Sequence, residues 1–167
     1  HKKQDPLEAK NYRPVSHLIE VSKIVEYAVH CQVYNNFVNQ NLFHPNHHGF
    51  IGSHNTGTAI IQLYDMWLEA AEHQELSAAL LLDLSAAFDI VDHSIFLRKL
   101  AAYKFHPDTI EWFRSYLSER RQVVQVESQL SEFIQLGEYS VPQGSILGPL
   151  VFLIFNNDFP DSTQEGE

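Results

Sequence analysis

The stretch "LLLDLSAAFDIVDH", residues 80–93, decides how the chain folds and where its chemistry lies. The continuous apolar run "AALLL" at 78–82 predicts a short strand that is buried on both faces. Asp83 stands where this strand should end. A carboxylate at the carboxyl end of a central strand can hold a hard divalent cation together with substrate phosphates. The alternative is that Asp83 and Ser85 only cap the next short helix.

Helices are expected on both sides of this strand. Two amphipathic patterns precede it, and further helices, a hairpin and a loop rich in Gly and Pro follow it. The expected elements are a helix at 16–38, a helix over the stripe 59–71 capped by Asn55 or Thr56, a helix at 94–102, a helix beginning at Pro107, a hairpin of 122–126 with 130–136, a loop at 141–149, and a buried helix with Pro149 at its first position. Because helices and strands do not alternate regularly, the pattern predicts a mixed α+β fold.

Both amphipathic helices are expected to bury one apolar face in the core. For the first helix that face comprises Leu18, Val21, Val25, Ala28, Cys31, Tyr34 and Phe37. For the second helix it comprises Ala59, Ile60, Leu63, Tyr64, Trp67, Leu68 and Ala71.

The composition of the 167 residues indicates a globular protein, with 44% hydrophobic and 19% charged residues. The longest apolar run, residues 146–155, is too short to cross a bilayer, and the polar N-terminus does not resemble a secretory signal. We therefore expect an intracellular protein of the cytoplasm and nucleus with no membrane contact. The formal net charge of -10 argues against a simple electrostatic binder of nucleic acid.

Four blocks of the sequence together resemble reverse transcriptases encoded by non-LTR (LINE-type) retrotransposons. They are "NYRPVS" (11–16), "LLLDLSAAFDIVDH" (80–93), "SYLSERRQVV" (115–124) and "VPQGSILGPLVFLIFNNDFP" (141–160). The resemblance covers nearly the whole chain in the family's order. It implies part of a polymerase, with fingers-side helices in residues 1–75 and a partial palm, a sheet packed on helices and incomplete at the C-terminus, in residues 76–167.

The resemblance implies RNA-directed DNA polymerase activity, in which a primer 3′-hydroxyl attacks a dNTP on an RNA template with two Mg²⁺ ions. Asp83 would be the first catalytic aspartate and a metal ligand, and the backbone carbonyl of Leu84 a further ligand. Phe88 would lie against the sugar of the dNTP. Gln143 and Gly144 would contact the dNTP and the template-primer, and Arg13 the template or the triphosphate. Asp89 and Asp92 would be structural.

Two departures from the family pattern carry expectations of their own. Lys104 and Ser140 stand where the family usually has glycine, so each should cost about 1 kcal/mol if its backbone requires a positive φ. The family's aromatic-Ala-Asp-Asp block, which holds the other catalytic carboxylate, is expected beyond Glu167. Asn157-Asp158 is no substitute, because it follows a helix-like run. We therefore expect the chain alone to be inactive.

Other functions remain as alternatives. A catalytically inactive remnant could serve as a module that binds nucleic acid or protein. An aspartyl nucleophile of the haloacid dehalogenase type would require an aspartate at the position of Ser85. The histidines His44, His47, His48 and His54 match no zinc spacing and are expected to belong to a polar loop. Oligomeric state is left open.

Overall fold

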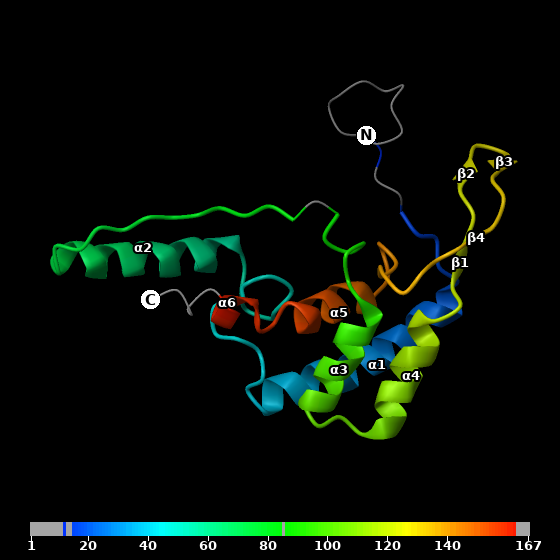
Figure 1. Cartoon of the computed structure of the whole chain (residues 1–167), viewed down its shortest axis with the longest axis horizontal. Coiled ribbons are helices and arrows are strands. Elements are labelled where there is room, and N and C mark those ends of the chain that lie inside the picture. Colours follow the sequence, from blue (N-terminus) through cyan, green and yellow to red (C-terminus); the bar gives the residue numbers. More distant parts are fainter. Residues whose placement is uncertain (1–11, 13–14, 85, 163–167) are drawn as a thin grey trace.

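The computed structural model describes residue 12, residues 15–84 and residues 86–162. Helices dominate this part of the chain, and the strands are short (Figure 1). In chain order the elements are α1 (Glu20–Asn39), α2 (Thr56–Glu72), α3 (His93–Ala102), α4 (Pro107–Leu117), β1 (Arg121–Gln122), β2 (Gln125–Val126), β3 (Gln129–Leu130), β4 (Ile134–Gln135), α5 (Leu147–Phe155) and α6 (Phe159–Ser162). The expected mixed α+β fold is confirmed in this coarse form.

The core lies around α5, which contacts α1 and α3, while α3 also contacts α4. α5 is apolar on nearly all sides, as expected, and its neighbours supply the facing side chains. The fully buried large residues include Phe37, Phe96, Leu100, Phe113, Leu147, Leu150 and Ile154. Burying each such side chain contributes about 1.5–3 kcal/mol, so this four-helix cluster provides most of the stability of the described part of the chain.

The buried face of α1 differs from the predicted one. Phe37 is fully buried, as expected, but Val21 and Val25 are 69% and 47% exposed. The buried face instead runs through Glu26, Val33 and Phe37. α1 is apolar on more than one side, and only the side that meets α5 is covered.

The prediction that α2 buries its stripe is wrong. The helix forms, and Asn55 caps it as expected by accepting a hydrogen bond from the Thr58 amide. However, α2 extends away from the helical cluster (Figure 1), and none of its residues is buried. Trp67 and Tyr64, expected in the core, are 41% and 58% exposed.

The strand expected at 78–82 is also absent from the structure. This segment is extended but pairs with no other strand, and it leads from the end of α2 back toward α3 (Figure 1). Its leucines are exposed, Leu81 to 91%. A strand requires a hydrogen-bonding neighbour, and no described segment lies at its edge to supply one. The expected palm sheet is accordingly not formed by the described residues.

The hairpin is confirmed, although its ladder is interrupted. β1 pairs with β4 through Arg121 opposite Gln135, and β2 pairs with β3 through Gln125 opposite Leu130, both antiparallel. The hairpin projects beyond α4 (Figure 1), and its strand residues are exposed.

Several helix boundaries follow local sequence signals. α4 begins at Pro107, as predicted. α3 begins one residue before its predicted start, and Asp92 caps it by accepting from the Ile95 amide, which confirms the structural role of this aspartate. α5 begins at Leu147, so the prediction that Pro149 holds the first position is wrong. The first amides of α5 find acceptors outside the helix, on the side chains of Glu26 and Ser145.

Two residues that replace family glycines do adopt a positive φ. Lys104 has φ 60° and Ser140 has φ 82°. Lys104 follows the C-terminus of α3, where its amide donates to Ala101 and the next amide, of Phe105, donates to Leu100. This is a Schellman motif, in which glycine is preferred at the position of Lys104. The expected backbone strain is therefore present at both positions.

Among the described residues, no helix is both long enough and apolar enough to cross a membrane.

Candidate functional site

The turn that contains Phe88 is joined by backbone hydrogen bonds to the segment that precedes Gln143. The Val141 amide donates to the Phe88 carbonyl at 2.9 Å, and the Ser140 amide donates to the Val91 carbonyl at 3.0 Å. Asp92 also forms an antiparallel bridge with Tyr139. Two motifs that are about 50 residues apart in the sequence are thereby held side by side.

The ring of Phe88 is half-buried and contacts two other aromatic rings. Its centroid is 5.5 Å from that of Phe152 on α5 and 6.4 Å from that of Phe50. These contacts hold one side of the ring against the core. The orientation of Phe88 is therefore set by α5, the helix that follows Gln143 and Gly144.

The PQG turn, defined here as Pro142, Gln143 and Gly144, meets the N-terminal motif. The amide of Ser16 donates to the carbonyl of Gln143 at 2.9 Å. Gly144 has φ +101°, which favours glycine. A Cβ at this position would lie 3.5 Å from the Ser16 carbonyl oxygen. Ser16, the last residue of the "NYRPVS" block, therefore lies at the PQG turn, and Arg13 lies outside the described residues.

Asp83 and Leu84 are placed differently. Both are exposed and lie at the end of the extended segment, just before the Phe88 turn. In the part of the chain that the structure describes, no three His, Cys, Asp or Glu side chains are grouped so that they could hold a metal ion. The structure therefore brings Phe88, Gln143 and Gly144 together, whereas Asp83 is exposed and belongs to no such group of described residues.

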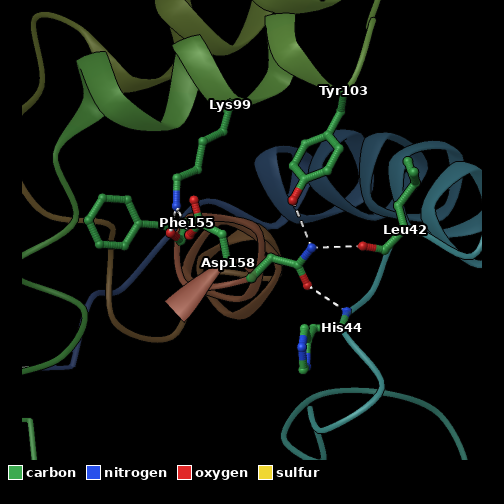
Figure 2. A network of polar contacts seen from close by, with 7 residues as sticks. Leu42, His44, Lys99, Tyr103, Phe155 and Asp158 are labelled. Carbon is green, nitrogen blue, oxygen red and sulfur yellow. Dashed lines mark hydrogen bonds and ion pairs between the residues drawn. The ribbon is translucent and has the colours of Figure 1, made fainter. Parts of the chain in front are cut away.

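Asn157 and Asp158, at the end of α5, have structural contacts instead (Figure 2). The buried side chain of Asn157 accepts from the His44 amide at 2.9 Å and donates to the Leu42 carbonyl and the Tyr103 hydroxyl, each at 2.7 Å. Lys99 donates to the Phe155 carbonyl and forms an ion pair with Asp158. Figure 2 shows Lys99 and Tyr103 pointing from α3 toward this helix end. The network ties α5 to α3 and to the loop after α1.

Comparisons with a family model and with individual proteins point to the same family. The sequence model of the family described as reverse transcriptase (RNA-dependent DNA polymerase) matches residues 1–166. The chain belongs to the reverse transcriptase family.

Its relatives include polymerases of mobile elements from Drosophila melanogaster. The probable RNA-directed DNA polymerase from transposon BS is 32% identical over 162 residues, which cover 96% of this chain and 18% of the relative. The RNA-directed DNA polymerase from mobile element jockey is 31% identical over 163 residues, 95% of this chain and 17% of the relative. The expected kinship with non-LTR elements is confirmed. The chain spans less than a fifth of the length of these relatives.

For a reverse transcriptase, the donor atoms at Asp83 fit a hard cation. A carboxylate and a backbone carbonyl are oxygen ligands, and Mg²⁺ is commonly held by one or two carboxylates, several waters and substrate phosphates. The two groups at Asp83 and Leu84 are therefore suitable ligands by type, although they form only part of such a site.

Two buried polar residues near the PQG turn were not predicted. Glu26 is 1% exposed and His93 is 9% exposed. The sequence offered a weak signal for Glu26, a charged residue within a helix that is otherwise apolar on several sides. It offered none for His93, which occupies the first position of α3 and bonds a residue 47 positions away.

Proposed function

We propose that this chain is part of an RNA-directed DNA polymerase that transfers a nucleotidyl group from a dNTP to a primer 3′-hydroxyl on an RNA template. One observation carries the proposal beyond family membership. Three motif blocks that are distant in the sequence meet through backbone hydrogen bonds at Ser16, Gln143 and Phe88. A polymerase requires such convergence, because the base, sugar and phosphates of one nucleotide must be contacted at the same time.

The residues at this place have distinct proposed roles. Phe88, held on one side by Phe152, presents its ring to the sugar of the dNTP. Gln143 and Gly144 contact the nucleotide and the template-primer, where the missing side chain of Gly144 allows close approach. Arg13 contacts the template or the triphosphate.

Asp83 and the carbonyl of Leu84 would hold Mg²⁺. When bound, two such ions supply Lewis-acid stabilisation of the charge that develops on the phosphate oxygens. The remaining role of this chain is to bind and orient the nucleotide, since positioning contributes a large part of the catalysis of phosphoryl transfer.

We also propose the division into a fingers-side part, residues 1–75, and a palm part, residues 76–167. In this proposal, the exposed segment 78–82 is a palm strand that becomes ordered against neighbouring strands. Its exposed leucines and unpaired backbone support this, because both require cover in a stable domain.

The alternative is a catalytically inactive remnant that binds nucleic acid or protein. The observation in its favour is that Asp83 belongs to no group of three or more metal-ligating side chains among the described residues. A two-metal reaction requires more ligands than one carboxylate provides.

Primer extension on an RNA template with Mg²⁺ separates the two functions. The protein assayed is the product of the longest open reading frame that contains this chain. Asp83→Asn should lower the rate of primer extension at least about 100-fold, because metal ligation stabilises the transition state by several kcal/mol. Asp65→Asn on the exposed α2 is the matched control and should retain full activity. Full activity in Asp83→Asn would exclude this aspartate, and no extension by the unchanged protein would favour the remnant.

A further inference from the structure

The segment from Ser140 to Leu147 contains two residues with a positive φ. Ser140 precedes the PQG turn with φ 82°, and Gly144 ends the turn with φ 101°. Gly144 is exposed and Gln143 is half-buried, whereas Val141 and Ser145 on either side are buried. A short loop with this backbone keeps one shape only if its two ends are held.

On the C-terminal side of the PQG turn, the loop is held at the beginning of α5. The first amides of a helix have no partner within it and need acceptors from elsewhere. The carboxylate of Glu26 accepts from the Ile146 amide at 2.8 Å and the Leu147 amide at 3.4 Å. The Ser145 hydroxyl accepts from the Gly148 amide at 2.9 Å, and Pro149 has no amide proton. All three amides at the positions from Ile146 to Pro149 therefore have an acceptor.

Glu26 reaches this helix end from α1, about 120 residues away in the sequence. A buried carboxylate is costly unless it is well paired. Here it receives two backbone amides at the positive end of a helix and a hydrogen bond from the Ser22 hydroxyl at 3.2 Å. Burial and the nearby charge of Glu26 together raise the pKa of Tyr116 to about 12, so this tyrosine stays neutral beside the carboxylate.

On the N-terminal side of the PQG turn, the loop is held at Ser140. His93 is buried, and its Nε2 donates to the Ser140 carbonyl at 2.7 Å. Because a carbonyl oxygen only accepts, Nε2 must carry a proton in this contact. The backbone amide of His93 donates to the Glu138 carbonyl at 3.0 Å. One residue at the start of α3 therefore holds both the backbone before Ser140 and Ser140 itself.

We propose that Glu26 and His93 are positioning residues that fix the two ends of the PQG turn, so that Gln143 and Gly144 are preorganised for the incoming nucleotide. This inference rests on the polymerase function proposed above. Both residues act through backbone groups of the loop, which they hold from α1 and α3.

Amide hydrogen exchange of this chain tests the holding of the loop without any activity. We expect Glu26→Ala to raise exchange at Ile146 and Leu147 by roughly tenfold or more, because charge-assisted hydrogen bonds are lost. Glu26→Gln retains an acceptor oxygen and should lie between Ala and the unchanged protein. Glu20→Ala, an exposed glutamate on the same helix, should change nothing there. Unchanged exchange in Glu26→Ala would overturn the inference.

The same comparison applies to His93. His93→Ala should raise exchange across 140–145, and His93→Gln, which keeps a donor, should restore most of the protection. His73→Gln is the matched control, since His73 also bonds a backbone carbonyl but lies exposed at the end of α2. Equal exchange in His93→Ala and His93→Gln would show that the hydrogen bond to Ser140 does not hold the turn.

Primer-extension kinetics of the longest reading frame connect the loop to the nucleotide. We expect Glu26→Ala and His93→Ala to raise KM for dNTP roughly tenfold with kcat changed less than about threefold. A merely structural loss would lower the active fraction, and therefore apparent kcat, at unchanged KM, which would overturn the inference. If the unchanged protein extends no primer, the proposed function fails and the link to nucleotide fails with it, while hydrogen exchange still decides whether the two residues hold the loop.

Discussion

Two regions of this chain have similar apolar content and opposite burial. The cluster of α1, α3, α4 and α5 buries Phe37, Phe96 and Phe113 completely. α2 and the extended segment 78–84 expose Trp67 to 41% and Leu81 to 91%. α2 has the cleaner apolar stripe, whereas α1 is apolar on more than one side. The difference teaches that an apolar stripe predicts which face of a helix can be buried. Whether that face is buried depends on a neighbouring surface that covers it.

The largest expected effect comes from the core. Phe37 contacts the rings of Phe43, Tyr103 and Phe105. Phe37→Ala should lower the free energy of unfolding by about 3–5 kcal/mol, through lost burial and the cavity that remains. Trp67→Ala on α2 should change it by less than about 0.5 kcal/mol. Urea denaturation followed by circular dichroism checks both. Equal effects of the two substitutions would show that α2 is packed in solution.

The next effect concerns the polar network of Figure 2. Asn157→Leu removes the hydrogen bonds that Asn157 forms with the His44 amide and the Leu42 carbonyl, and we expect a loss of about 2–3 kcal/mol. Asn35→Ala, at an exposed position of α1, is the control and should stay within about 0.5 kcal/mol. The urea midpoint measures the difference. A neutral Asn157→Leu would mean that apolar packing alone joins α5 to the loop after α1.

Removing a helix cap should have different effects on stability in the two regions. Asp92→Ala in the packed α3 should lower global stability by about 1 kcal/mol. Asn55→Ala should open only α2, because that helix contacts none of the clustered helices α1, α3, α4 and α5. Hydrogen exchange distinguishes local opening from global unfolding. A global loss in Asn55→Ala would contradict the comparison.

The contribution of Asp92 should also depend on pH. The Ser94 hydroxyl and then the Ile95 amide hold the pKa of the Asp92 carboxyl below its ordinary value of 3.8. This stabilisation is present above pH 3.8 and is lost as pH falls through the lower pKa of the folded state. The difference in urea midpoint between the unchanged protein and Asp92→Ala should therefore shrink below pH 3.8.

The smallest expected effect is a gain. Lys104→Gly should stabilise the chain by about 0.5–1 kcal/mol, because its backbone has φ 60°. Ala101→Gly, within the last turn of the same helix, should destabilise it by a similar amount. Thermal melting of both variants measures the sign. Destabilisation by Lys104→Gly would show that the Lys104 side chain has contacts that outweigh its strained backbone.

Local signals in the sequence predicted local structure well. Pro107 and Asn55 marked the starts of two helices, the turn between 126 and 129 joined a hairpin, and the glycine positions occupied by Lys104 and Ser140 do have a positive φ. Each of these features depends on residues within a few positions of one another. The roles of Phe88, Gln143 and Gly144 at a polymerase site stay predictions, which come from the recognisable blocks in which these residues lie.

Other features could not be predicted, since they depend on which surfaces meet. Glu26 and His93 bond backbone groups 120 and 47 positions away. The early start of α5 follows from the acceptors that Glu26 and Ser145 supply. The strand expected at 78–82 has the right residues and no partner among the described ones.

The sequence by itself determined the family and the positions and local starts of most helices, and it predicted the residues that a polymerase site would use. Only the tertiary structure decided which apolar faces are covered, that the blocks around Ser16, Phe88 and Gln143 meet, and that two buried polar residues hold the loop between them. The physical reason is the range of the interactions. Capping and backbone preference act over one helical turn, whereas burial and long-range hydrogen bonds exist only once distant segments have come together.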